Sequence, residues 1–275
     1  MAKTVTMVAD LRAALAGARP RRIGLVPTMG ALHEGHLSLV REARRHADMV
    51  VVSIFVNPAQ FAPNEDFDSY PRNLDSDLEK LDREADLVFT PTARDIYPQG
   101  YATTISVDGP GTGLESDFRP HFFSGVATVV AKLLVAASPD VALFGEKDYQ
   151  QLQVVRRMVR DLGLPVEIVG APTLREPDGL ALSSRNAYLS ADERKVAGRL
   201  NLILKDAIIR ARQGDLRDTE AWAEKALRDS GFEPVDYVAI RDAETLAPAA
   251  SLERPARILA AARVGKTRLI DNMPV

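Results

Sequence analysis

The chain has 275 residues, a formal net charge of −3 and no cysteine. The balanced charge lacks the basic excess of a nucleic-acid-binding protein, and the missing cysteine excludes disulfides, thiolate zinc sites and a covalent thioester. No apolar run approaches the roughly 18 residues that a membrane span needs. With 46% hydrophobic residues, the composition is that of a globular protein with one large domain or two ordinary ones, and it suits a reducing cytoplasm.

The first 174 residues alternate amphipathic stretches with short apolar runs. An N-terminal surface helix is expected within 1–20. Strands are expected at 22–26, 49–56, 86–89, 140–144 and 166–169, separated by helices at 36–47, 74–85, 125–137 and 148–162. The uninterrupted apolar run at 49–56 is typical of a strand that is buried on both faces. This alternation predicts an α/β fold, a Rossmann-like doubly wound parallel sheet whose ligands bind at the carboxyl ends of its strands.

The pattern changes after residue 174. Two helical segments are expected at about 191–213 and 217–230, followed by strand-like runs at 236–242, 256–264 and 267–271. Helices followed by strands are the order of an α+β unit. We therefore predict a first domain over 1–174 and a smaller α+β C-terminal domain over 175–275.

Two glycine-containing sequences resemble phosphate-binding loops but lack required residues. RVGKT (263–267) looks like the end of a P-loop, yet Ala260 stands where that motif needs Gly, so a hairpin turn is expected. GPGTG (109–113) lacks the third glycine of a dinucleotide-binding fingerprint, and no long helix is expected to follow it. We interpret it as a loop.

The stretch TMGALHEGH (28–36) joins an expected strand to an expected helix. Gly30 and Gly35 would let the backbone approach a ligand, and a helix N-terminus offers unpaired N–H groups and a positive dipole end to phosphate. His33 and His36 would add side-chain donors to the same anion site. A zinc site is an alternative, but the i, i+3 spacing differs from the i, i+4 spacing of H-E-x-x-H. Two surface-turn histidines without a function are a third interpretation.

Three further segments place polar side chains at strand ends or at the domain junction. FVNPAQF (55–61) carries Asn57 and Gln60, although Asn-Pro also starts ordinary turns. FGEKDYQQL (144–152) offers Lys147 to phosphate and carries Gln151 one turn further on, and LALSSRN (180–186) offers two hydroxyls and Arg185. Taken alone, each segment is also compatible with an ordinary turn, helix cap or loop.

Taken together, these segments resemble the signatures of the pantothenate synthetase (pantoate–β-alanine ligase) family, within the HxGH nucleotidyltransferase superfamily. PTMGALHEGH, FVNPAQF, GEKDYQQL and LSSRN occur in the family's order and spacing, and the ending TRLIDN is also similar. One segment departs from the family pattern. The usual R-P-G-H-F-x-G-V reads RPHFFSGV (119–126) here, with His121 in place of Gly and Phe122 in place of His, and we assign no role to that histidine position.

The resemblance implies ATP-dependent condensation of (R)-pantoate with β-alanine, through pantoyl adenylate, to give pantothenate, AMP and pyrophosphate. It implies a cytoplasmic homodimer that uses Mg²⁺ and binds neither nucleic acid nor membrane. Residues 1–174 would bind ATP and pantoate, and residues 175–275 would close over the site. His33, His36 and Lys147 would be the catalytic residues, with His36 as the proton donor.

The resemblance also implies binding roles for a larger set of residues. ATP would contact Met29, Gly30, Ala31, Leu32, His33, Glu34, Gly35, His36, Gly145, Glu146, Lys147, Asp148, Leu182, Ser183, Ser184 and Arg185. Pantoate would contact Gln60, Gln151 and Asn57, because amides suit its hydroxyl groups, while Pro27, Met29 and Phe61 would face its methyl groups. Asp77, in YPRNLDSDL (70–78), is the predicted Mg²⁺ ligand. The alternative for Asp77 is an exposed carboxylate at a helix start.

Two other functions stay open at this point. A non-catalytic nucleotide sensor would keep the glycine turn but would have no reason to combine Lys147 with Gln60 and Gln151. A nucleotidyltransferase that releases an adenylated product would need no site for a second nucleophile.

Overall fold

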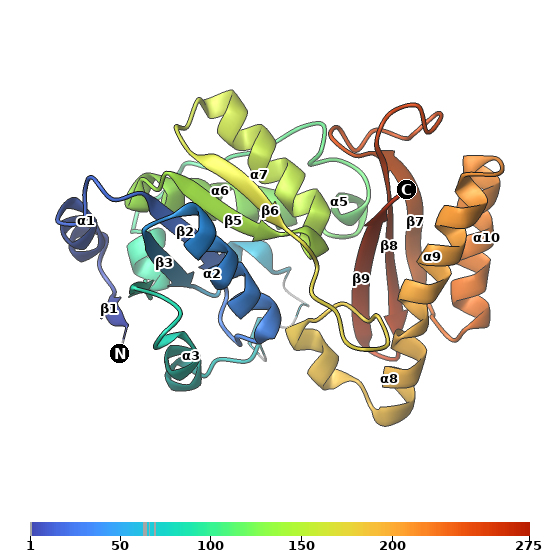
Figure 1. The fold of residues 1–275 in the computed structure, drawn as a ribbon, viewed down its shortest axis with the longest axis horizontal. Helices are drawn as coiled ribbons and strands as arrows, with labels where there is room; N and C mark the ends of the chain where they lie inside the picture. Colours follow the sequence, from blue (N-terminus) through green and yellow to red (C-terminus); the bar gives the residue numbers. More distant parts are fainter. Residues whose placement is uncertain (1, 63–64, 66, 69) are drawn as a thin grey trace.

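The computed structural model describes residues 2–275 except 63–64, 66 and 69. Six parallel strands form one sheet in the order β1–β4–β3–β2–β5–β6 (Figure 1). In chain order they are β1 (Lys3–Val5), β2 (Ile23–Thr28), β3 (Met49–Ile54), β4 (Leu87–Phe89), β5 (Val141–Gly145) and β6 (Glu167–Ala171). The predicted fold class is confirmed.

Helices cover both faces of this sheet. The apolar side chains of α2 (Glu34–His46) and α3 (Leu74–Leu81) form one core layer with the sheet. Those of α1 (Val8–Ala16), α6 (Phe122–Ala137) and α7 (Tyr149–Leu162) form the layer on the opposite face. Two short helices, α4 (Ala93–Ile96) and α5 (Glu115–Phe118), lie in the connection to α6.

The central strands are buried on both faces, as their sequence predicts. Side chains alternate between the faces of a strand. Accordingly, Leu25 and Val51 belong to the core layer of α6 and α7, whereas Val26, Val50 and Val52 belong to the layer of α2. A continuous apolar run is required where water reaches neither face.

The strand order reverses between β2 and β5. From β2 the chain moves outward through β3 and β4, and it then returns to the other side of β2 to form β5 and β6. Such a reversal opens a crevice at the carboxyl ends of the two strands, because their connections leave in opposite directions. These ends are Thr28 and Gly145, directly before the predicted histidine and lysine segments.

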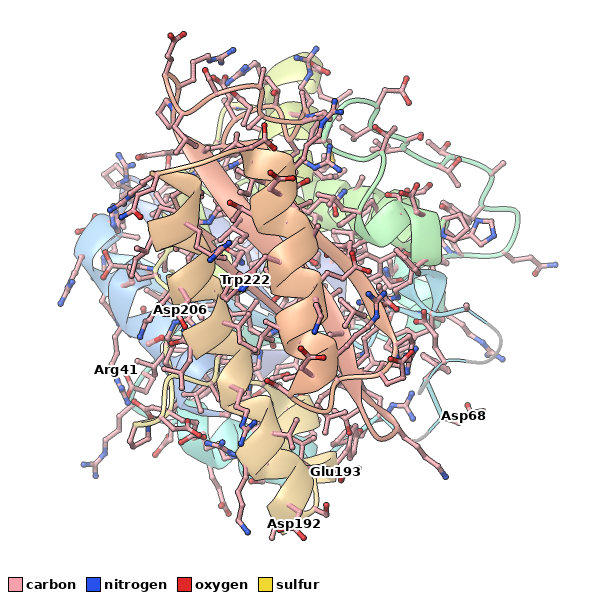
Figure 2. All side chains as sticks on the ribbon, turned by 90° about the vertical axis from the view of Figure 1, so that its right-hand side faces the viewer. Arg41, Asp68, Asp192, Glu193, Asp206 and Trp222 are labelled. Atoms are coloured by element: carbon pink, nitrogen blue, oxygen red, sulfur yellow. The ribbon has the colours of Figure 1, made fainter. Side chains whose placement is uncertain are left out.

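The C-terminal part is a three-stranded antiparallel sheet with helices on one face. Its strands are β7 (Val235–Asp242), β8 (Ala256–Val264) and β9 (Thr267–Pro274), and its helices are α8 (Ala191–Ala197), α9 (Arg199–Ala211) and α10 (Leu216–Asp229). Figure 2 shows α9 and α10 lying side by side over the strands. Ala239 and Leu259 pack on the other face, in the core layer of α6 and α7. The domain boundary at 174/175 stays a prediction.

The structure differs from the sequence-based expectations at several elements: the short helices α4 and α5 were not expected, and α3 ends at Leu81 instead of residue 85. The strand β1 was not expected; it has three residues and pairs with β4. The helix expected over 191–213 is interrupted at Gly198, where a Cβ atom would lie 2.6 Å from Asp178 Oδ2. That carboxylate is paired with Arg194, so glycine lets the pair approach the helix.

The hairpin turn at Gly265 and the loop at 109–113 are confirmed.

No helix within the described ranges has the length and apolarity that a membrane crossing requires.

We predict that Gly125→Ala destabilises the fold. Gly125 lies on α6 against η1 (Pro58–Gln60), and a Cβ atom there would meet the Ala59 carbonyl oxygen at 2.2 Å. Overpacking against backbone typically costs about 1–3 kcal/mol, and we expect a loss of that size in the free energy of unfolding measured with urea. The control is Gly17→Ala, because Gly17 has φ −70° and its nearest atoms would lie 3.7 Å from the new Cβ. Equal stability of the two variants would contradict this packing account.

Candidate active site

A tight turn connects β2 to α2. Gly30 has φ +83° and Ala31 has φ +50°, so two consecutive residues adopt the left-handed conformation that glycine tolerates best. A Cβ atom at Gly30 would lie 3.0 Å from Asp77 Oδ2. The Asp77 carboxylate accepts 2.8 Å hydrogen bonds from the N–H groups of Ala31 and Leu32, and this fixes the turn against α3.

His33 and His36 are part of the N-terminal cap of α2. The His33 Nδ1 atom accepts from the Gly35 N–H at 3.1 Å, and the His36 Nδ1 atom accepts from the His33 N–H at 3.3 Å. A Cβ atom at Gly35 would lie 2.9 Å from the His33 ring, so glycine is required for this cap. Since each Nδ1 is an acceptor, the proton of each neutral ring is assigned to Nε2.

The two imidazoles are held in the neutral form. Burial, with smaller contributions from Lys147 and Lys80, lowers the pKa of His33 to about 4. Burial, then the neighbouring His33 and Lys147, lowers the pKa of His36 to about 3. The ring centroids are 4.1 Å apart, so a charge on one ring opposes a charge on the other. At neutral pH the pair therefore presents two uncharged Nε2–H donors.

Two further loops reach the same place. Lys147 lies in η2 (Glu146–Asp148), which follows β5, and its Nζ atom is 3.8 Å from Asp148 Oδ2. Ser183 caps η3 (Ser184–Tyr188) by accepting from the Arg185 N–H at 3.3 Å. Leu182 lies against Gly35, since a Cβ there would be 3.6 Å from Leu182 Cβ. Three segments thus converge: residues 29–36, called the histidine turn below, residues 145–148, called the lysine turn, and residues 183–185, called the serine loop.

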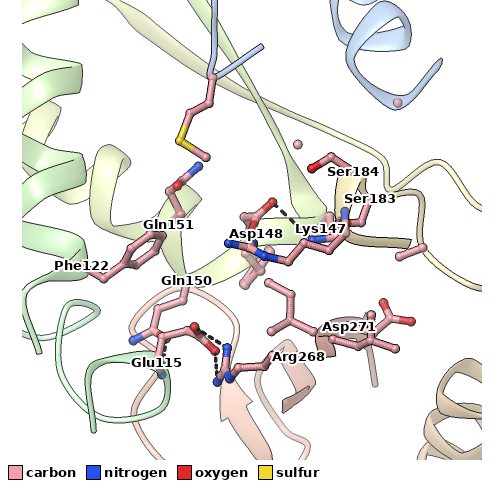
Figure 3. Close-up of a pocket in the computed structure, with 18 of the residues that line it drawn as sticks. Glu115, Phe122, Lys147, Asp148, Gln150, Gln151, Ser183, Ser184, Arg268 and Asp271 are labelled. Atoms are coloured by element: carbon pink, nitrogen blue, oxygen red, sulfur yellow. Dashed lines mark hydrogen bonds and ion pairs between the residues drawn. The ribbon is translucent and has the colours of Figure 1, made fainter. Parts of the chain in front are cut away.

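A cavity of about 630 Å³ lies between these loops and the C-terminal sheet. Figure 3 shows Gln151 and Phe122 at one side in this view, Ser183 and Ser184 at the other, and Lys147 with Asp148 between them. The predicted site residues that line the cavity are Met29, His33, Gly35, His36, Gln60, Gly145, Lys147, Asp148, Gln151, Leu182, Ser183, Ser184 and Arg185. Four sequence segments that lie up to about 150 positions apart therefore form one site.

The remaining predicted residues do not line the cavity. Of those that the structure describes, Gly30, Ala31, Leu32, Glu34, Asn57, Asp77 and Glu146 are not among its lining residues. Asn57 is 1% exposed, and its Nδ2 group donates to Gln60 Oε1 at 2.9 Å and to the Gly125 carbonyl at 3.1 Å. Its Oδ1 atom accepts from the Tyr97 hydroxyl at 2.7 Å. Asn57 thereby orients the Gln60 amide so that Nε2 remains for the cavity.

The surroundings of Asp77 do not fit a magnesium ligand. Asp77 is 2% exposed, so the alternative of an exposed helix-start carboxylate is wrong. Both oxygens already accept backbone N–H groups, and Lys80 Nζ lies 3.9 Å away. Mg²⁺ requires several oxygen ligands in octahedral geometry. Across the described residues, no three His, Cys, Asp or Glu side chains gather where they could hold a metal ion.

Phe122 and His121, the departures from the family pattern, have different environments. Phe122 begins α6 and lines the cavity, with the Arg119 guanidinium 3.8 Å above its ring centroid. Arg119 is held by both Glu65 oxygens at 2.6 Å and by the Gln60 carbonyl at 3.2 Å. His121 is exposed at the helix start and makes no side-chain cap. Phe122 thus forms an apolar wall beside Gln60.

A buried ionic network at the C-terminal side of the cavity was not foreseen from the sequence. Arg268 donates to both Glu115 oxygens at 2.7 and 2.8 Å and to Asp236 at 2.6 Å. The Tyr237 hydroxyl donates to Glu115 at 2.9 Å. Burial, and next the Glu115 charge, raises the pKa of Tyr237 well above its ordinary value. The only signal for this network was the resemblance of TRLIDN to the family ending.

Comparison with known proteins identifies the family. The model of the pantoate-beta-alanine ligase family matches residues 3–274. Pantothenate synthetase of Mesorhizobium japonicum is 59% identical over 277 residues, covering 99% of this chain and 98% of the relative. That of Caulobacter vibrioides is 58% identical over 260 residues, covering 93% and 91%.

Solved structures agree with the sequence comparison. Pantothenate synthetase from Thermus thermophilus superposes with a TM-score of 0.92 at 50% identity, covering 98% of both chains. Pantoate-beta-alanine ligase from Francisella tularensis, complexed with beta-gamma ATP and beta-alanine, has a TM-score of 0.84 at 35% identity, covering 99% of this chain and 97% of that one. Fold, cavity and sequence therefore agree, and the chain belongs to the pantoate–β-alanine ligase family.

Proposed function

We propose that the cavity at the carboxyl ends of β2 and β5 carries both half-reactions of ATP-dependent pantoate–β-alanine ligation. The observation that carries this proposal is the convergence of the histidine turn, the lysine turn, the serine loop and Gln60 on one cavity. In the first half-reaction the pantoate carboxylate attacks the α-phosphorus of ATP, and pyrophosphate leaves. In the second, the β-alanine amine attacks the acyl carbon of pantoyl adenylate, the bond to the phosphate oxygen breaks, AMP leaves and the nitrogen loses a proton.

The phosphate end of the cavity is formed by His33, His36, Lys147 and the loop from Ser183 to Arg185. Transfer at phosphorus needs positioning and charge stabilisation more than covalent catalysis. The two Nε2–H groups and the Lys147 ammonium are donors for charge that develops on the α-phosphate and on departing pyrophosphate. Bound phosphate would favour the protonated form of His36, which is the form that its predicted role as proton donor requires. The Francisella relative crystallised with an ATP compound supports ATP as the nucleotide.

The pantoate end is formed by Gln60 and Gln151 with apolar neighbours. Asn57 occupies Gln60 Oε1, so Gln60 offers its Nε2 hydrogens to a substrate oxygen. Pro27, Met29 and Phe61 line the same cavity and suit the two methyl groups of pantoate. A site that pairs amides with substrate hydroxyls discriminates strongly against molecules that lack them.

The second half-reaction needs only space and orientation for β-alanine. Pantoyl adenylate is an activated acyl group, so the amine reacts without a protein nucleophile, which agrees with the absence of cysteine. A cavity of about 630 Å³ lies in the size range of small-molecule sites. The β-alanine bound to the Francisella relative supports the same class of second substrate here.

The family resemblance also predicts a metal ion, an oligomeric state and a cellular compartment. Magnesium would accompany ATP, held by phosphate oxygens and water. The chain would form a homodimer and would work in the cytoplasm, and the composition without cysteine is compatible with that compartment.

The reaction is tested by following AMP formation from ATP with pantoate and β-alanine, omitting each in turn. We expect AMP only when all three are present, and exchange of labelled pyrophosphate into ATP with pantoate alone. Full-rate release of pyrophosphate without β-alanine, with accumulation of pantoyl adenylate and no AMP, would favour an enzyme that releases the adenylate. Binding of ATP without any turnover would favour a nucleotide sensor.

We predict that His36→Ala lowers kcat for pantoate-dependent pyrophosphate exchange by about 10²–10³, the usual effect of removing one preorganised donor. Aminolysis of supplied pantoyl adenylate should fall less, because pyrophosphate has already left. The control is His46→Ala, at the C-terminal end of the same helix, where the ring faces Glu42 at 3.2 Å. Unchanged exchange in His36→Ala would show that the phosphate role is wrong.

A further inference from the structure

The strand β9 carries the TRLIDN sequence, to which the reaction assigns no role. Side chains alternate along a strand. Leu269 and Met273 belong to the core beneath α9 and α10. The cavity lining includes Arg268, Leu269, Ile270, Asp271 and Asn272. Asn272 lies on the same face of β9 as Arg268 and Ile270, directly beside the lysine turn.

Asn272 holds the backbone of the lysine turn. It is 3% exposed, and its Nδ2 group donates to the carbonyls of Glu146 at 2.9 Å and Lys147 at 2.8 Å. Its Oδ1 atom accepts from Arg257 Nε at 2.6 Å. Asn272 belongs to the cavity lining, but both of its amide hydrogens and its carbonyl oxygen are already engaged with protein groups.

Arg257 reinforces the same contact. It donates to Glu146 Oε2 at 2.9 Å, and its guanidinium lies 3.8 Å above the ring centroid of Tyr149. The turn that presents Lys147 is thus bound at two carbonyls, at the Glu146 carboxylate and at the first residue of α7. The bonds come from β8 and β9, about 110–125 positions away in the sequence.

Asp271, the neighbouring residue, holds the other nucleotide loop. It is 3% exposed and accepts a bidentate pair from Arg175 at 2.7 and 2.8 Å. Arg175 also donates to the Gly179 carbonyl at 3.0 Å. Residues 174–182 form a small hairpin, closed by Leu182 N–H to the Leu174 carbonyl at 2.9 Å, and this hairpin leads directly into Ser183.

We propose that Asp271 and Asn272 are a pair of positioning residues that set the separation between Lys147 and the loop from Ser183 to Arg185. Because the two residues are adjacent on one strand, one rigid element fixes both segments. This inference rests on the proposed roles of those segments at the ATP phosphates. A misplacement of about 1 Å in such a site can cost about 10²-fold in rate.

The contact between Asn272 and the lysine turn is tested with Asn272→Ala, and Met273→Ala is the matched control. Met273 is the next residue of β9, is 8% exposed and faces the opposite core, so its truncation loosens the strand without touching the lysine turn. We expect Asn272→Ala to lower kcat for pyrophosphate exchange by about 10–10² with little change in the KM for pantoate. Amide hydrogen exchange over 145–149 should be faster in Asn272→Ala than in Met273→Ala.

The contact between Asp271 and Arg175 is tested separately with Asp271→Asn. This variant keeps the size of the side chain but weakens the pair with Arg175, so hydrogen exchange should rise over 174–186 and not over 145–149. If Asn272→Ala is too unstable to purify, Asn272→Asp is measured in its place. It keeps the shape and sets an oxygen against the two carbonyls, and the same local effects are expected.

The proposed role of Lys147 is checked in parallel with Lys147→Ala. If Lys147→Ala abolishes exchange while Asn272→Ala preserves both the exchange rate and the protection of 145–149, the positioning inference is overturned and the role of Lys147 stands. Equal losses of activity in Asn272→Ala and Met273→Ala would also overturn it, because a general loosening of β9 would then suffice. If Lys147→Ala keeps full exchange, the role of Lys147 itself is wrong, whatever hydrogen exchange shows for Asn272.

Discussion

The site depends on one arrangement of hydrogen bonds: backbone N–H groups at the start of α2 donate to the Nδ1 atoms of His33 and His36. These bonds fix the tautomer, so that the hydrogen of each ring sits on Nε2 and is available to a ligand. Burial and nearby lysines keep the rings uncharged. Three features hold this geometry: the turn at Gly30, the absence of a side chain at Gly35, which leaves room for the His33 ring, and the Asp77 carboxylate.

Charge is distributed unevenly along the cavity. At the end away from the phosphates, Arg119 is paired with Glu65, and Arg268 with Glu115 and Asp236, in bonds of 2.6–2.8 Å. Two guanidinium groups here face three carboxylates, so this end of the cavity carries no excess of positive charge. At the histidine end, Lys147 faces Asp148 at 3.8 Å, which is longer than a hydrogen bond. The Lys147 ammonium therefore has no hydrogen bond to that carboxylate, and it can donate to a phosphate beside the Nε2–H groups.

The sequence predicted features that have a local signature. The apolar run 49–56 indicated a strand buried on both faces, and the glycine-containing stretch 28–36 indicated a turn from a strand into a helix start. It did not predict β1, because three residues carry too little periodicity. It assigned Asn57 to the substrate and Asp77 to a metal, because a sequence shows residue types but not the partners that already occupy them. The Glu115–Arg268 pair spans 153 positions, and no local pattern reports a contact of that kind.

The most direct test of this account is the protonation of the two rings, followed by ¹⁵N NMR across pH with His33→Asn and His36→Asn used for assignment. We predict that both rings at pH 7 are neutral and carry the proton on Nε2. They should stay neutral as the pH falls below 6.5, with His33 titrating at a pKa of about 4 and His36 at a pKa of about 3. Protonation of either ring near pH 6.5, or a proton on Nδ1, would contradict the claim that the helix cap prepares two neutral donors for the phosphates.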